Sequence, residues 1–114
     1  MNKYKNKKVV LDNIKFDSRK EARRYAELKL LEKSGEIKDL RLQTPYELIP
    51  SQYAMIDGKW KCIERPCKYI ADFTYIDCSS GQLVVEDTKG MRTKEYVIKR
   101  KLMFQKYGIM IKEI

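Results

Sequence analysis

The sequence predicts one α/β domain, in which a mixed sheet has a helix on each side and carries an extra β-hairpin. Residues 18–34 and 94–107 indicate the helices, because each combines apolar side chains at helical spacing with a Ser or Thr N-cap and a glycine beyond the last turn. The pair Asp57-Gly58 between two apolar runs indicates the hairpin. At 114 residues the chain can hold one core but not two, so residues 1–114 are expected to form a single domain.

The first part of the chain predicts a short hairpin followed by a helix. Apolar residues at both ends of the segment 9–16 flank Asp12-Asn13, a pair that is typical of a turn. Ser18 is a candidate helix N-cap, and Glu21, three residues later, completes a capping box. These signals predict that the helix begins here and ends at the Ser-Gly pair that follows residue 33.

The rest of the chain alternates predicted strands with turns, before and after the second helix. The predicted strands cover residues 36–42, 46–49, 53–56, 59–63, 69–76, 83–90 and 109–114. A turn at residues 78–81 joins the two most apolar of these strands. The resulting order of elements places both helices against one mixed sheet.

An acidic residue, Asp72, stands in a predicted strand that is apolar on both faces. Alternation places Ala71, Phe73 and Tyr75 on one face, and Ile70 and Ile76 beside Asp72 on the other. An unpaired buried charge is costly, so Asp72 is expected to have a compensating cation. Either a metal ion or Lys89 could supply it.

The next predicted strand ends in Asp87-Thr88-Lys89, and alternation points Asp87 and Lys89 the same way. Two carboxylates and a lysine on adjacent strands suit metal-assisted hydrolysis of a phosphodiester. The chain has no histidine, which excludes Ser-His, Cys-His and His-metal chemistry. Catalysis would therefore depend on carboxylates, Lys or Tyr.

The charge balance favours a polyanionic partner. Lys and Arg number 25 against 16 Asp and Glu, which gives a net charge of +9. Nucleic acid is the commonest soluble polyanion, and a basic but merely solvated surface is the alternative. No stretch approaches the roughly 18 apolar residues of a membrane span. Three cysteines without a secretory context indicate reduced thiols and a cytoplasmic location.

Together, Asp72, Asp87-Thr88-Lys89 and the helix residue Glu21 resemble the PD-(D/E)XK nuclease superfamily. The chain as a whole is similar to a family of small uncharacterised phage and prophage proteins placed in that superfamily. The resemblance implies a restriction-endonuclease-like αβββαβ core, with Ala71 at the position where the motif has proline. It also implies a metal-dependent DNA endonuclease, encoded by a phage or prophage and working in the bacterial cytoplasm. Branched or junction DNA is the expected substrate.

The same resemblance implies the roles of the site residues. Asp72, Asp87 and Glu21 are expected to bind Mg²⁺, for which Mn²⁺ would substitute, and Thr88 to add its backbone carbonyl. Lys89 is expected to position or deprotonate the attacking water. Two alternatives remain at this point: an Asp72–Lys89 ion pair without metal, and a Glu21 that serves only the capping box. Two further alternatives concern the whole protein: a catalytically inactive nucleic-acid-binding module, or an accessory subunit of a phage DNA-processing assembly.

Three further expectations concern residues around this site. Arg92, Lys94 and Lys99 are predicted to contact phosphates of DNA, with a solvated helix face as the alternative. Glu86 is excluded from the site because it faces opposite Asp87, and is assigned to a supporting or surface position. Gln43, just beyond a predicted strand end, is interpreted as a polar residue beside a turn, with contact to a ligand as the alternative.

A homodimer is also expected, because cutting both strands of DNA in a coordinated way needs two sites. The predicted hairpin around Asp57-Gly58 supplies apolar residues beyond the core, Tyr53, Met55 and Trp60, and is the candidate contact.

Overall fold

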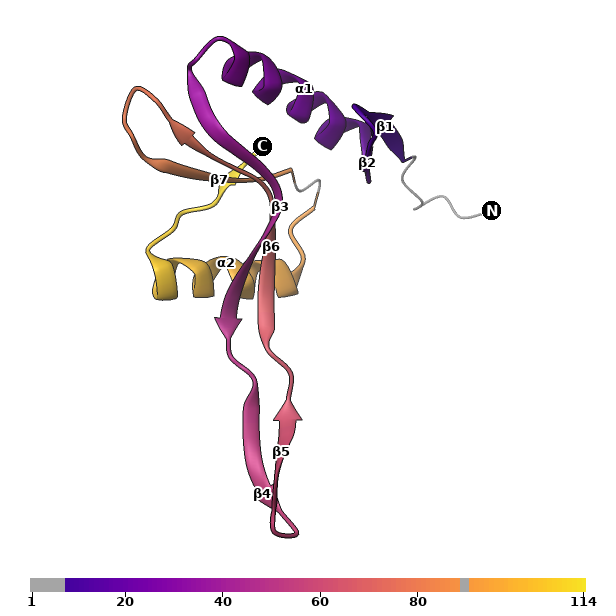
Figure 1. Ribbon diagram of the computed structural model, residues 1–114, viewed down its shortest axis with the longest axis vertical. Helices are drawn as coiled ribbons and strands as arrows, with labels where there is room; N and C mark the ends of the chain where they lie inside the picture. The colour runs from indigo at the N-terminus through magenta and orange to yellow at the C-terminus, as the bar shows by residue number, and fades with distance from the viewer. Residues whose placement is uncertain (1–7, 89–90) are drawn as a thin grey trace.

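A computed structural model describes residues 8–88 and 91–114, and its elements confirm the predicted α/β fold (Figure 1). They are β1 (Val9–Leu11), β2 (Ile14–Phe16), α1 (Arg19–Lys33), β3 (Ile37–Ile49), β4 (Gln52–Ile56), β5 (Lys59–Glu64), β6 (Cys67–Asp77), β7 (Leu83–Asp87), α2 (Lys94–Tyr107) and β8 (Lys112–Glu113). The main sheet is mixed, and the hairpins β1–β2 and β4–β5 are separate two-stranded sheets. The order α1, β3, β6, β7, α2, β8 is compatible with an αβββαβ core.

The main sheet has the strand order β3-β6-β7-β8. β6 pairs antiparallel with β3 and β7, whereas β7 and β8 are parallel. Val84 packs against the core cluster that contains residues of α1, and Val85 lies in the cluster that contains residues of α2. Because consecutive strand residues point to opposite faces, the two helices cover opposite faces of β7.

Local signals explain where the helices begin and what they bury. The Ser18 hydroxyl accepts a hydrogen bond from the Glu21 amide at 3.1 Å, and the Thr93 hydroxyl accepts one from the Tyr96 amide at 3.1 Å. α1 buries Ala22, Tyr25 and Leu28 against β2, β3 and β6, and α2 buries Tyr96 and Met103 against the other cluster. The two N-caps and both helix ranges agree with the prediction.

β3 runs without a break from Ile37 to Ile49 and joins the two strands that the sequence predicts at residues 36–42 and 46–49. Pro45 is tolerated because β3 is an edge strand of the sheet, where a missing backbone donor breaks no ladder bond. Two residues of this strand, Asp39 and Gln43, have positive φ angles of 55° and 51°. Gln43 therefore lies inside a strand and not beside a turn. The last strand is shorter than expected and comprises two residues.

The expected alternation along β6 holds on each side of Asp72 but not across it. Ala71 belongs to the α2 cluster, while Phe73 and Tyr75 belong to the α1 cluster. Ile70 is 52% exposed, so this strand is not buried on both faces. The prediction was wrong here because the β6 segment before Asp72 packs against α2 only, and its other face is open.

The β4–β5 hairpin extends away from both helices (Figure 1). It makes the molecule elongated, with extents of 58 × 46 × 26 Å. Asp57 and Gly58 at its tip both have positive φ angles, 49° and 76°, as the two-residue turn of a right-twisted hairpin requires.

Candidate active site

The candidate site begins at Glu21, in the first turn of α1. Glu21 is 6% exposed, and its carboxylate accepts a hydrogen bond from the Gln43 side-chain amide at 3.1 Å. Burial, followed by the negative charges of Asp72, Asp17 and Asp87, raises the pKa of Glu21 to about 7. Glu21 therefore does more than complete a helix cap: it lies among other carboxylates.

Gln43 connects the helix to the sheet. Its Nε2 lies 3.1 Å from Glu21 Oε1 and 3.5 Å from Asp72 Oδ1, the second distance being a long contact. One amide group thus faces the two carboxylates that the sequence placed in the site. The prediction missed this role, because nothing local to residue 43 reports a contact with residues 22 positions before it and 29 after it.

Asp72 accepts two hydrogen bonds from Thr88. The Thr88 amide and hydroxyl both lie 2.8 Å from Asp72 Oδ2. Asp72 is partly buried and not fully buried as the sequence predicted, so its burial alone does not require a cation. Thr88 was expected to act through its carbonyl, but its described contacts use its two donors.

Asp87 lies at the end of β7 and is 2% exposed. The Tyr69 hydroxyl donates to Asp87 Oδ2 at 2.6 Å. Burial, together with this hydrogen bond to Asp87, raises the pKa of Tyr69 well above its usual value, so Tyr69 remains a donor at physiological pH. Tyr69 is a second residue that the sequence prediction missed.

The oxygen chemistry of the site suits a hard cation such as Mg²⁺, although the ligand set is not assembled in the described chain. Within residues 8–88 and 91–114, no three acidic, Cys or His side chains are grouped closely enough to hold a metal ion. The carboxylates of Asp72, Asp17 and Asp87 nevertheless act on Glu21, and a cation would relieve that repulsion. Lys89, the predicted catalytic lysine, lies outside the described residues.

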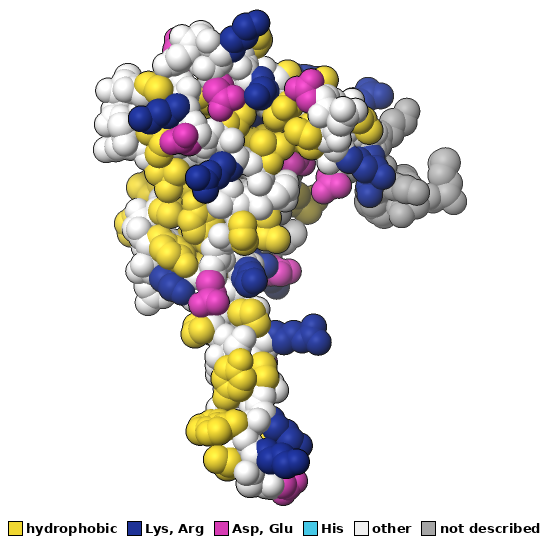
Figure 2. All heavy atoms as spheres, viewed as in Figure 1, with side chains coloured by type: hydrophobic (Ala, Val, Ile, Leu, Met, Phe, Trp, Pro, Cys, Tyr) yellow, Lys and Arg dark blue, Asp and Glu magenta, His cyan; other side chains and the backbone are white. Residues whose placement is uncertain are grey.

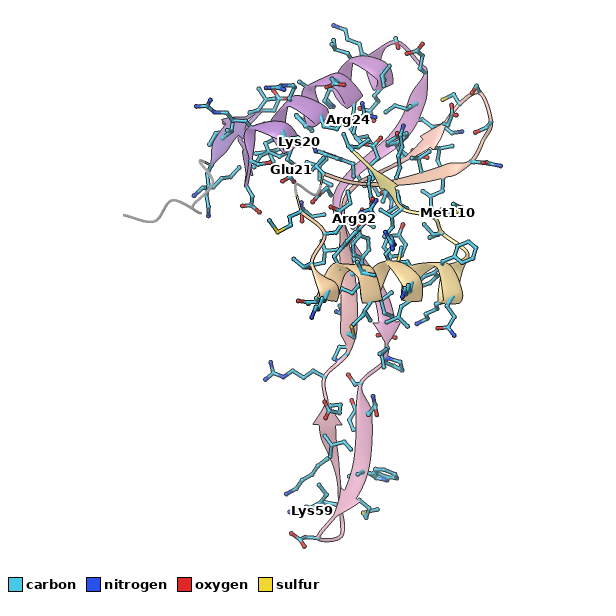
Figure 3. All side chains as sticks on the ribbon, turned by 180° about the vertical axis from the view of Figure 1, so that it is seen from behind. Lys20, Glu21, Arg24, Lys59, Arg92 and Met110 are labelled. Atoms are coloured by element: carbon cyan, nitrogen blue, oxygen red, sulfur yellow. The ribbon has the colours of Figure 1, made fainter. Side chains whose placement is uncertain are left out.

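Glu86, next to Asp87, is on the opposite face of β7 as predicted, but it is not a surface residue. It is fully buried and accepts hydrogen bonds from Arg24 Nε at 2.8 Å and Arg24 Nη2 at 2.6 Å. The Tyr75 hydroxyl also donates to it. Arg24 and Glu21 lie on the same side of α1 (Figure 3), but Arg24 contacts Glu86, whereas Glu21 contacts Gln43.

The three predicted phosphate contacts differ in their surroundings. Arg92 is exposed and forms an ion pair with Glu113, and Lys99 lies 3.1 Å from Glu95. Lys94, at the start of α2, is exposed and has no ion pair in the described part of the chain. A hollow of about 280 Å³ beside Tyr69 is lined by Lys68, Tyr69, Ile70, Thr93, Glu95, Tyr96 and Lys99.

Comparison with known proteins identifies a family. A family model described as "Protein of unknown function (DUF1064)" matches residues 1–112. The chain belongs to the DUF1064 family. No curated protein and no solved structure matches it. Neither helix of this DUF1064 member, among the residues described, has the length and apolar character to cross a bilayer. The description of DUF1064 assigns no chemistry.

Proposed function

We propose that this protein is a Mg²⁺-dependent DNA endonuclease, encoded by a phage or prophage and working in the cytoplasm of its bacterial host. The observation that carries the proposal is the buried Glu21 among negative charges, with a pKa raised to about 7. A fold gains nothing in stability by burying an acid beside other acids, whereas a site that takes up a divalent cation requires it.

In the proposed site, Glu21, Asp72 and Asp87 hold the ion. A bound Mg²⁺ would supply a Lewis acid able to activate a water and to stabilise negative charge on the phosphate. Gln43 orients the Glu21 and Asp72 carboxylates, and the Tyr69 hydroxyl fixes Asp87. Because the pKa of Glu21 is about 7, its carboxyl would release a proton as the cation binds.

DNA is the proposed substrate because the chain carries a charge of +9 and basic side chains lie near the carboxylates. Lys68 and Lys99 line the hollow beside Tyr69, whose hydroxyl contacts Asp87. Lysines on this side of the site would neutralise phosphates that flank the cleaved bond. Branched or junction DNA remains the preferred substrate in the proposal.

The direct test is cleavage of labelled linear, flapped and four-way DNAs with Mg²⁺, with Mn²⁺ or with EDTA. Asp72→Asn and Asp87→Asn should each lower the cleavage rate by at least about 100-fold, since each removes a proposed ligand of the ion. Asp39→Asn is the matched control: it removes the same charge at an exposed bulge of β3, where asparagine tolerates the positive φ. Cleavage that persists in EDTA, or that Asp72→Asn leaves unchanged, would contradict the proposal.

A second candidate is a nucleic-acid-binding module without catalysis, or an accessory subunit of a DNA-processing assembly. It is favoured by the hydrogen bonds that Tyr69, Thr88 and Gln43 already make with the acidic residues of the site. A titration with Mn²⁺, in which the electron paramagnetic resonance signal of the free ion is monitored, separates the nuclease from the non-catalytic module. A module without catalysis should bind DNA without cleaving it. Its uptake of Mn²⁺ should be the same in the wild type and in Asp72→Asn.

A further inference from the structure

The β4–β5 hairpin has two chemically different faces. Cross-strand pairs share a face, and neighbouring pairs alternate between faces. Met55 lies opposite Trp60 and Tyr53 opposite Cys62, which makes one face uncharged and largely apolar. On the other face Ala54 lies opposite Lys61 and Ile56 opposite Lys59. Figure 2 shows the same division, with hydrophobic side chains along one side of the hairpin and Lys or Arg along the other.

The apolar hairpin face, defined as Tyr53, Met55 and Trp60, is not covered by the described chain. These side chains are 60%, 58% and 69% exposed, respectively. A two-stranded hairpin on its own is marginally stable in water, and it has no second layer in which to bury such residues. Contiguous exposed apolar surface of this kind indicates an interaction site.

We propose that the apolar hairpin face is the contact between two copies of this chain. Each copy carries a charge of +9, so two copies repel one another unless they meet through surfaces without lysine or arginine. The apolar hairpin face meets that condition, because Lys59 and Lys61 lie on the opposite face. A two-fold axis brings the same face of both copies together and leaves all four lysines pointing outward.

The size of the face sets the expected strength of the contact. Aromatic side chains present about 150–250 Å² each, so the exposed parts of Tyr53, Trp60 and Met55 amount to roughly 400 Å² per copy. Two such faces bury less than the roughly 1,200 Å² of a stable interface. The dimer should therefore be weak, and its population should rise with concentration between about 1 µM and 1 mM.

The test exploits the fact that Trp60 is the single tryptophan of the chain. Sedimentation velocity without DNA should show a mass that rises from 13.6 kDa towards twice that value. Trp60 fluorescence should move to shorter wavelength over the same concentrations. Met55→Lys should abolish both changes, whereas the control Ala54→Lys, which adds the same charge on the opposite face, should leave them in place.

Three outcomes would overturn the proposal. The first is a mass that stays at 13.6 kDa throughout, and the second is an equal effect of Met55→Lys and Ala54→Lys. The third is a Trp60 emission that shifts only when DNA is added, which would assign the apolar hairpin face to nucleic acid. The experiment uses no cleavage assay, so its result is independent of the proposed endonuclease activity.

Discussion

Two neighbouring residues of β7, Glu86 and Asp87, lie in buried clusters of opposite character. Glu86 faces α1, where the guanidinium of Arg24 balances its charge. Arg24 and the hydroxyl of Tyr75 both donate hydrogen bonds to its carboxylate. On the other face, Asp87 acts with Asp72 to raise the pKa of Glu21. Neither Glu21 nor Asp72 forms an ion pair within the described chain. The first cluster contains its own cation, whereas the second contains Glu21, a carboxyl whose pKa is raised by burial and by neighbouring acids.

This difference separates a carboxylate with its own cation, Glu86, from a carboxyl that burial and neighbouring acids push towards protonation, Glu21. A buried acid that is paired with a cation is compatible with a structural core, and removing either partner lowers the stability of the fold. Buried acids that crowd one another lower the stability of the empty protein, and such groups are concentrated at functional sites. Substitutions on the two sides of β7 should therefore have different effects on stability.

The largest effect is expected from Glu86→Ala. It leaves the Arg24 charge, whose side chain is only 15% exposed, without its buried partner. The free energy of unfolding should fall by about 3 kcal/mol in urea titrations. The double variant Arg24→Met/Glu86→Leu should recover most of that loss. A loss below about 1 kcal/mol in Glu86→Ala would show that this cluster does not stabilise the fold.

The second prediction concerns pH. The pKa of Glu21 is about 7 in the folded protein and 4.5 in an unfolded reference, so between these values the folded state binds more protons. The metal-free protein should therefore lose stability as pH rises from 4.5 to 7, by up to about 3 kcal/mol. Glu21→Gln should remove this part of the slope in urea titrations at pH 5 and pH 8.

The control for that experiment is Glu64→Gln, which neutralises an exposed carboxylate of the β4–β5 hairpin. It should leave the slope as in the wild type. Equal slopes in the wild type and in Glu21→Gln would mean that the carboxylates do not act on one another.

The third prediction concerns the divalent ion. At ten times its Kd, Mg²⁺ should stabilise the folded protein by about 1.4 kcal/mol at pH 8, measured as a rise in Tm. The gain should be smaller at pH 5, where Glu21 is protonated because its pKa is about 7. Asp72→Asn should abolish the gain, and Glu64→Gln should preserve it. A gain of the same size in Asp72→Asn would place the ion elsewhere.

The smallest effect is expected from the basic residues near α2. Lys94→Ala should reduce the salt dependence of DNA binding by about one phosphate contact, measured by fluorescence anisotropy over a range of KCl concentrations. Arg92→Ala should have less effect, since Glu113 already pairs with its guanidinium. A slope that neither variant changes would remove this surface from the proposed interface.

The sequence predicted the helices well because their signals are local. The N-caps at Ser18 and Thr93 act on residues three positions later, so a short window contains the whole signal. The prediction divided β3 into two strands because Pro45 interrupts its pattern, and the position of β3 at the sheet edge, which tolerates Pro45, depends on pairing with distant strands.

The candidate site was predicted only where it coincides with the motif. The positions of Asp72 and Asp87 in the site were predicted because each stands in an apolar strand. The contacts of Glu86 and Gln43 were not, because Arg24 lies 62 residues before Glu86 and Gln43 contacts Glu21 from a backbone conformation that sequence does not reveal. Cross-sheet partners of this kind are set by the tertiary fold.

The hairpin also has a consequence for how the chain assembles. β4–β5 and β3–β6 follow one another along the same two stretches of chain, so the turn at Asp57-Gly58 closes both ladders (Figure 1). Once this turn has formed, each further cross-strand pair closes only a short extra segment, and the entropic cost of loop closure grows slowly. We expect Gln43 and Asp72, 29 residues apart, to meet by zippering from that turn and not by a random search. In kinetic terms, we expect assembly of the site to begin at the exposed tip of this hairpin.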